Sequence, residues 1–269
     1  MGWISRQFTT RTIVLIPIAI AINISLGYTV QNVLKLPIYL DSIGTILVGV
    51  LAGPIAGALT GVLSNLIWQL IAGGTAGPFA ITAGVIGLMA GLWGYLGVYR
   101  SRPASRNQLL VAAAIAVVVI VVVVLPILNN PAYSDPNNGY PSWVFTAIAI
   151  IAILAAIMVA GFILVRRDLA GLWVALAGVL TGIVAAIVSA PIAAYVFGGV
   201  TGAGVDVLVA ALRQGGSDVL HASLGQGLFS DPIDKTITSF VVFIVLAGLS
   251  RRIVARFPNG ERLTGQART

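Results

Sequence analysis

The sequence predicts an all-α fold, a polytopic membrane helix bundle of about eight helices. Three observations favour it: 58% of the 269 residues are hydrophobic, only 9% are charged, and the mean hydropathy is +1.03. A soluble domain carries about 25% charged residues, so this chain has too few charges to cover a water-exposed surface. The apolar residues also form long runs, separated by short breaks that hold most of the arginines. We therefore expect helices embedded in a bilayer.

The composition also limits the kinds of metal, cofactor and nucleic-acid site that the chain could form. The chain has no cysteine and a single histidine, His221, which excludes disulfides and thiolate metal sites and disfavours any protein-held transition metal. No metal and no cofactor are expected. The net charge of +7 sits in the breaks between apolar runs, so it indicates membrane topology rather than nucleic-acid binding.

The predicted helices follow one another along the chain. The first runs over residues 12–28 and is interpreted as a retained helix, because Asn23 interrupts its apolar run and no small-residue cleavage site follows. The later apolar segments are 38–52, 55–71, 79–98, 109–128, 143–165, 169–197 and 233–249. Segments 38–52 and 55–71 meet at Gly53 and Pro54. Because proline lacks an amide donor and clashes with the preceding turn, they should be two helices joined by a tight corner.

Charge distribution supports this topology. With the amino terminus and the corner inside, only Lys35, Arg213 and Lys235 of the 15 basic residues fall outside, as the positive-inside rule requires. Residues 198–230 hold many glycines and several charges, so we expect a re-entrant or surface loop on the outer side. Both termini are then cytoplasmic.

Four parts of the chain follow from these segments: 1–107 as the first half of the membrane core, 108–168 as a peripheral hairpin, 169–250 as the second half, and 251–269 as a basic cytoplasmic tail. The hairpin is expected at the periphery because its first helix is almost purely apolar and lacks glycine, which suits contact with lipid chains.

Small residues recur at four-residue spacing in several segments, for example at Gly178 and Gly182, and predict close helix packing. The first helix also carries a small, mildly polar face that suits a protein partner. Internal packing is the alternative for every such stripe. The candidate partner-docking residues are Ala19, Ala21, Asn23 and Ser25.

Polar and aromatic residues concentrate at the outer ends of the predicted core helices. Such a cluster is typical of a small-molecule site, although solvation at the membrane interface is the alternative for each residue taken alone. For Asp41 the favoured alternative is a helix cap. The candidate substrate-binding residues are Tyr28, Asn32, Lys35, Tyr39, Asp41, Asn65, Trp68, Gln69, Tyr195, Asp206, His221, Gln226, Asp231, Asp234 and Lys235.

Catalytic motifs do not occur in the sequence. It contains no P-loop lysine, no H-E-x-x-H and no G-x-S-x-G, so we expect neither an enzyme nor an ATPase, and transport would need a partner that supplies energy.

Three stretches resemble a known family. Residues 36–45 (LPIYLDSIGT), followed by Gly53-Pro54 and 57–66 (GALTGVLSNL), resemble the second and third helices of substrate-binding S components of energy-coupling-factor ABC transporters, and 227–235 (GLFSDPIDK) resembles the entry to their last helix. The resemblance covers most of the chain outside 109–165. It implies a six-helix core, to which this chain adds a hairpin.

The resemblance also implies a function. Such a subunit captures a vitamin, a vitamin precursor or another micronutrient from outside a bacterial or archaeal cell membrane. It delivers the molecule inward with a transmembrane coupling protein and cytoplasmic ABC ATPases, and the first helix meets the coupling protein. The alternative, from a different class, is a membrane sensor module of a signalling system, whose output would need a separate protein.

Overall fold

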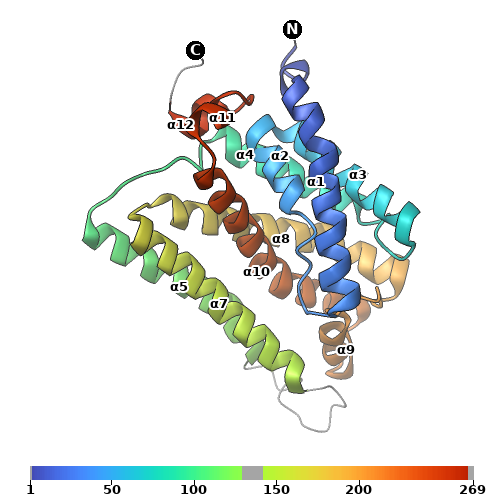
Figure 1. The fold of residues 1–269 in the computed structure, drawn as a ribbon. Helices are drawn as coiled ribbons and strands as arrows, with labels where there is room; N and C mark the ends of the chain where they lie inside the picture. The colour runs from blue at the N-terminus through green and yellow to red at the C-terminus, as the bar shows by residue number, and fades with distance from the viewer. Residues whose placement is uncertain (1, 129–141, 266–269) are drawn as a thin grey trace.

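The computed structural model describes residues 2–128 and 142–265, and over these ranges the chain is helical without a β-strand. Residues 129–141, between the predicted segments 109–128 and 143–165, lie outside the described residues. Figure 1 shows the arrangement of the helices. In chain order they are η1 (Ser5–Gln7), α1 (Thr10–Tyr28), the π-helical turn η2 (Thr29–Val33), α2 (Ile43–Ala52), α3 (Pro54–Ala72), α4 (Ala80–Tyr95), α5 (Arg106–Leu128), α7 (Ser142–Arg166), α8 (Ala170–Phe197), α9 (Asp206–Gln214), α10 (Val219–Gly248), α11 (Arg251–Ala255) and α12 (Gly260–Thr264).

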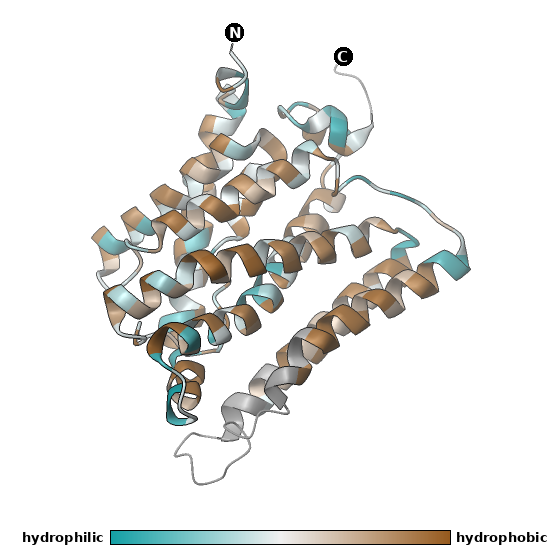
Figure 2. Ribbon diagram, turned by 180° about the vertical axis from the view of Figure 1, so that it is seen from behind, coloured by the Kyte–Doolittle hydropathy of each residue, from teal (hydrophilic) through white to brown (hydrophobic). Residues whose placement is uncertain are grey.

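The all-α class and the multi-pass membrane character agree with the prediction. Within the described ranges, four segments are long and apolar enough to cross a membrane, namely Thr10–Val33, Pro54–Ala72, Ala149–Arg166 and Ala170–Phe197. Helices α2 and α4 and residues Arg106–Val122 of α5 are also apolar, but they are shorter than these four segments. Hydrophobic residues extend along most of the helices, whereas hydrophilic residues gather at their ends and in the links (Figure 2).

The predicted corner between the second and third helices is confirmed. Gly53 separates α2 from α3 with a φ of +125°, a conformation that favours glycine, and Pro54 is the first residue of α3. The Oε1 atom of Gln7 accepts hydrogen bonds from the amides of Ile55 (2.9 Å) and Ala56 (3.2 Å). The start of the chain therefore satisfies free amides at the start of α3.

The carboxyl-terminal tail lies at the same end of the bundle. Asn259 donates from its side chain to the carbonyl of Val50 (3.0 Å) and from its backbone to that of Leu51 (2.9 Å), beside the corner. Arg262 donates to the carbonyl of Tyr95 at 2.6 Å, at the end of α4. Both chain ends and the corner thus occupy one end of the bundle (Figure 1).

The last long helix differs from the prediction. It begins at Val219 rather than at residue 233, so the expected loop 198–230 is a short link, helix α9 and the first turns of α10. Asp218 caps α10 by accepting from the amides of Leu220 and His221. Among the glycines that suggested a loop, Gly227 is a packing site, because a Cβ there would lie 3.1 Å from the Cβ of Ala186 in α8. Gly198, Gly202 and Gly216 lie in the links, where a Cβ would meet no atom within 4 Å.

Small residues bring the core helices into close contact. A Cβ at Gly178 would lie 2.6 Å from the Cα of Thr236, and one at Gly182 would lie 2.4 Å from the Cα of Pro232, so α8 and α10 approach backbone to backbone. Gly57 of α3 and Gly87 of α4 meet in the same way. The stripes predicted from the sequence therefore serve internal packing at these helix pairs.

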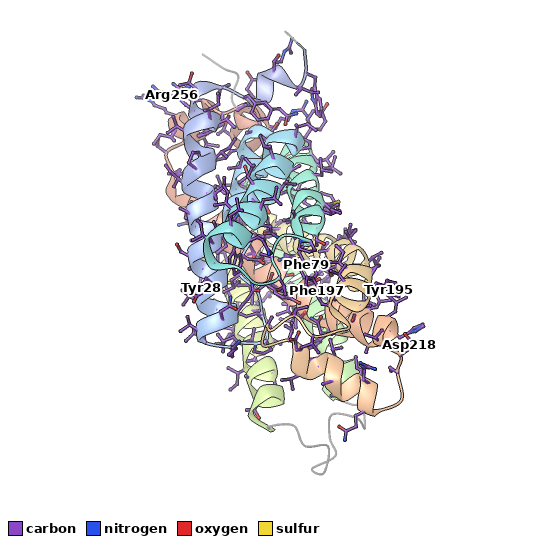
Figure 3. The ribbon with its side chains drawn as sticks, turned by 90° about the vertical axis from the view of Figure 1, so that its right-hand side faces the viewer. Tyr28, Phe79, Tyr195, Phe197, Asp218 and Arg256 are labelled. Carbon is purple, nitrogen blue, oxygen red and sulfur yellow. The ribbon has the colours of Figure 1, made fainter. Side chains whose placement is uncertain are left out.

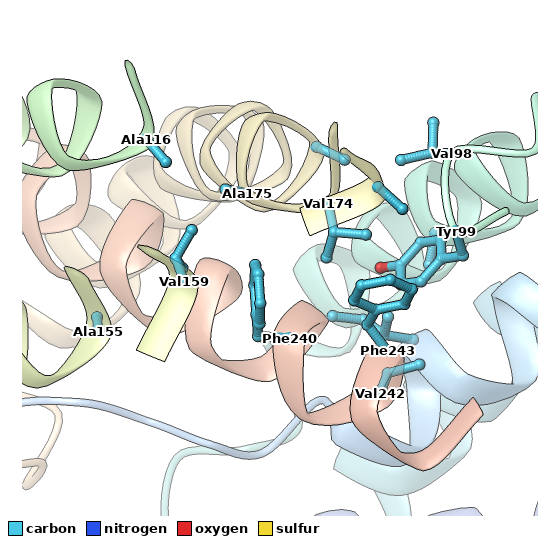
Figure 4. Close-up of a cluster of buried hydrophobic side chains, with 14 of the residues drawn as sticks. Val98, Tyr99, Ala116, Ala155, Val159, Val174, Ala175, Phe240, Val242 and Phe243 are labelled. Carbon is cyan, nitrogen blue, oxygen red and sulfur yellow. The ribbon is translucent and has the colours of Figure 1, made fainter. Parts of the chain in front are cut away.

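Helices α5 and α7 form the hairpin, lie side by side and pack against α8 and α10 (Figure 1). Val159 and Ile163 are fully buried with Phe240 of α10 in the hydrophobic core, part of which is shown in Figure 4. Asp168, before α8, accepts from the Ser101 hydroxyl (2.6 Å) and joins the two ends of the hairpin. The other side of α5 is exposed along Leu110, Val111, Val118 and Val122, as expected for a lipid-facing surface.

Candidate functional site

A cavity opens at the end of the bundle opposite the chain termini. Together with its open mouth it encloses about 1220 Å³ of space not filled by atoms. In Figure 3, Arg256 lies toward the terminal end, and Tyr28, Phe79, Phe197 and Asp218 lie toward the opposite part of the molecule. The cavity is lined from α1, η2, α3, α4, α8, α9 and α10 and from the links between them.

Most of the predicted site residues come together here, although they lie far apart in the sequence. The predicted residues that line the cavity are Tyr28, Asn32, Tyr39, Asp41, Asn65, Trp68, Asp206, Gln226, Asp231 and Lys235.

Three further predicted residues lie outside the cavity wall but bond to the interhelical links around it. Lys35 donates to the carbonyl of Gly202 at 2.9 Å, so it ties the link after η2 to the link before α9. Gln69 accepts from the amide of Gly77 at 2.8 Å and holds the link between α3 and α4. Asp234 is fully buried beneath the link 34–42. These three residues support the cavity without lining it.

Two predicted residues lie apart from the cavity. Tyr195 is 72% exposed on α8. His221 is exposed on the first turn of α10, where its Nδ1 pairs with the carboxylate of Asp218. Neither of these two residues lines the cavity. At Tyr195 the helix turns the ring outward, and at His221 the residue lies in an exposed turn of α10 instead of the expected loop.

An ion-pair network joins α10 to the link 34–42. Lys235 Nζ donates to Asp234 Oδ2 (2.5 Å), Ser42 Oγ (3.0 Å) and Asp41 Oδ1 (3.5 Å). Asp234 Oδ1 accepts from the amides of Tyr39 (3.2 Å) and Leu40 (2.8 Å). Leu40 has a φ of +52°, which costs a non-glycine residue conformational energy, so these bonds hold a backbone shape that the chain alone disfavours.

Asp41 has a different role from the helix cap that we favoured as its alternative. Its carboxylate accepts from Gln31 Nε2 (3.1 Å) and from Lys235, whereas the cap position of α2 is Ser42, which makes no side-chain cap bond. Asp41 is thus part of the cavity wall and of the charged network.

Asp206 begins α9 and organises the preceding link. It accepts from the hydroxyl and amide of Thr201 (2.7 and 2.8 Å) and from the amide of Gly202 (2.6 Å). Burial raises the pKa of Asp206 above its ordinary value, while the bonds from Thr201 and Gly202 oppose that rise.

Aromatic rings form another part of the wall. Trp68 is 6% exposed, the Tyr39 hydroxyl accepts from Gln226 Nε2 at 3.2 Å, and Phe79 stacks on Phe197 with ring centroids 5.6 Å apart. The sequence did not identify Phe79, Thr82 or Ser223 as lining residues. Ser223 could have been found from its spacing to Gln226 had the start of α10 been known, because residues three apart share a helix face.

The candidate docking residues on α1 divide into two pairs. Ala19 and Asn23 are buried: Asn23 donates to Thr45 Oγ1 (2.8 Å) and Ser64 Oγ (2.9 Å) and accepts from the amide of Gly44 (2.7 Å). These two residues pack α1 against α2 and α3, so their assignment to an outer docking surface is wrong. Ala21 and Ser25 are exposed.

The lining of the cavity combines features of a binding site. Among the described residues, no three histidine, cysteine, aspartate or glutamate side chains are placed to hold a metal ion. The cavity instead combines aromatic walls with a few polar groups, the usual form of a small-molecule site. No family model, curated protein or solved structure matches this chain.

Proposed function

We propose that the chain is the substrate-capture subunit of an energy-coupling-factor importer. It binds a vitamin, a vitamin precursor or another micronutrient from the outer side of a bacterial or archaeal cell membrane. The observation that carries the proposal is the cavity with aromatic and polar walls, placed at the end of an apolar bundle opposite the arginine-rich end.

The orientation follows from charge. Arginines of the η1 segment, the α4–α5 link and the tail gather at the end that holds both termini, while Asp41, Asp206 and Asp231 line the cavity at the other end. The positive-inside rule supports an orientation in which the termini lie in the cytoplasm and the cavity mouth opens outside.

The subunit would need partners to move its cargo, because the sequence holds no nucleotide-binding motif. In this proposal a transmembrane coupling protein and cytoplasmic ABC ATPases supply the energy. The exposed residues Ala21 and Ser25 of α1 belong to the surface that meets the coupling protein.

Ligand binding tests the proposal directly. The protein is purified in mild detergent, retained small molecules are identified by mass spectrometry, and micronutrients are titrated by calorimetry. We expect one to be held in the cavity, and Trp68→Ala to weaken it by about 10- to 100-fold, the loss typical of a buried aromatic contact. The matched control is Trp3→Ala, because Trp3 is 56% exposed and does not line the cavity. If no micronutrient binds, or both variants behave alike, the proposal fails.

Thiol labelling tests the orientation. The chain has no cysteine, so a single cysteine can be introduced at exposed Arg106, beside the arginine-rich end, or at exposed Gln214 in α9. In intact cells a membrane-impermeant maleimide should label Gln214→Cys, whereas Arg106→Cys should react only after the membrane is opened. The reverse pattern would refute the proposed sidedness.

A further inference from the structure

We propose that the cavity takes an organic cation whose positive group lies against Asp231 and whose planar part contacts the aromatic walls. This inference rests on the proposed function, since it names the chemical class of the cargo.

Asp231 is the carboxylate that the cavity leaves without a partner. It is 4% exposed and lines the cavity, yet among the described residues no hydrogen bond reaches its oxygens and no cationic group lies within 4.0 Å. A buried charge without a partner is costly. A cationic ligand would supply the missing counter-charge.

The other carboxylates around the cavity are already satisfied. Asp41 and Asp234 share Lys235, and Asp206 is bonded by Thr201 and Gly202. Asp231 therefore differs from the other three carboxylates in that no described group bonds to it.

Lys235 is not available to an anionic ligand. An ammonium group has three N–H donors, and those of Lys235 are directed to Asp234, Ser42 and Asp41. It is the one lysine or arginine among the described residues that line the cavity. Near the cavity, the carboxylates of Asp41, Asp206, Asp231 and Asp234 outnumber the ammonium groups of Lys35 and Lys235, so the local field favours a cation.

Two buried hydroxyls also favour a ligand with polar groups. The Oγ atoms of Ser223 and Thr82 are buried without a hydrogen-bond partner among the described residues, and both side chains line the cavity. Such groups are normally satisfied in a folded protein. Ser223 and Asp231 lie eight residues apart on α10, hence on one helix face, and a ligand carrying N–H groups could reach both.

The aromatic lining suits a cation as well. Tyr28, Trp68 and Phe79 line the cavity from three different parts of the chain. Cations are attracted to aromatic faces, most strongly where water is excluded, and planar ligands stack on them.

Three probes of similar shape separate charge from shape: N-methylquinolinium, neutral quinoline and anionic quinoline-2-carboxylate. Each is titrated into the detergent-purified chain. We expect the cation to bind at least about tenfold more tightly than quinoline, with the carboxylate weakest. Asp231→Asn should remove this preference. Its unfolding temperature should stay near that of the parent, because no described group bonds to Asp231. Asp218→Asn is the control, since it removes an exposed carboxylate on the same helix.

Two results would overturn the inference: equal binding of the three probes, including binding of none, or an unchanged cation preference in Asp231→Asn. The nature of the retained micronutrient separates this failure from that of the proposed function. A neutral or anionic micronutrient held in the cavity would refute the organic cation and leave the capture function standing. If no micronutrient of any charge binds, both proposals fail.

Discussion

Replacing Gly182 with leucine is expected to lower the unfolding temperature of the detergent-purified protein by roughly 10 °C or more, or to prevent its accumulation in the membrane. A Cβ at this position would lie 2.4 Å from both the Cα and the nitrogen of Pro232. These are backbone atoms of α10, which cannot rotate away as a flexible side chain would. The two helices would have to separate, which costs at least about 3 kcal/mol in a closely packed interior.

Gly161→Leu is the matched control for this experiment. Gly161 is also a helical glycine, in α7, but a Cβ there meets no atom within 4 Å. We expect an unfolding temperature close to that of the parent chain. If Gly182→Leu proves impossible to purify, Gly182→Ala adds only the Cβ and should show a smaller loss in the same direction. Equal stability of the variants at positions 161 and 182 would contradict the backbone contact between α8 and α10.

Replacing Asp234 with alanine is expected to destabilise the protein by about 3–5 kcal/mol, which corresponds to roughly 10–15 °C in unfolding temperature. The carboxylate is fully buried and serves three groups: the Lys235 ammonium and the amides of Tyr39 and Leu40. Its removal leaves Lys235 with one weaker carboxylate partner and two amides without an acceptor. The link 34–42 should then loosen, and ligand affinity should fall together with stability.

Two further variants identify the cause of that loss. Asp234→Asn keeps an oxygen for the two amides but removes the charge, so it should fall between the parent and Asp234→Ala. Asp218→Ala removes an exposed helix cap at the start of the same helix and should cost much less stability than Asp234→Ala. An Asp234→Ala protein as stable as Asp218→Ala would show that the buried network contributes little.

The sequence predicted the helical class and most helix boundaries, because long apolar runs must form helices to satisfy their backbone groups in a bilayer. It also predicted the corner at Gly53 and Pro54, since those residues have strong local preferences for a turn and for a helix start. The small-residue stripes could also be recognised in the sequence, but the sequence did not show which helix each stripe contacts.

The expectations that failed depended on partners distant in the chain. Charges and glycines at 198–230 suggested a loop, but in the structure α9 and the first turns of α10 take up much of that range, and Gly227 packs on α8. Likewise, Asn23 was assigned to an outer face, whereas Thr45, Ser64 and Gly44 bond it inside the bundle. Local pattern cannot distinguish a polar residue that is solvated from one that a neighbouring helix satisfies.

The amino-acid sequence by itself determined that this chain forms apolar helices, where it turns between the second and third, and at which end its arginines gather, because hydrophobicity, proline chemistry and charge act locally. Only the tertiary structure decided that the polar residues of several distant segments surround one cavity, that Asp234 and Lys235 hold the link 34–42 beside it, and that no described group bonds to the carboxylate of Asp231. Those outcomes depend on which side chains helix packing brings within hydrogen-bonding distance, and the order of residues along the chain does not specify those distances.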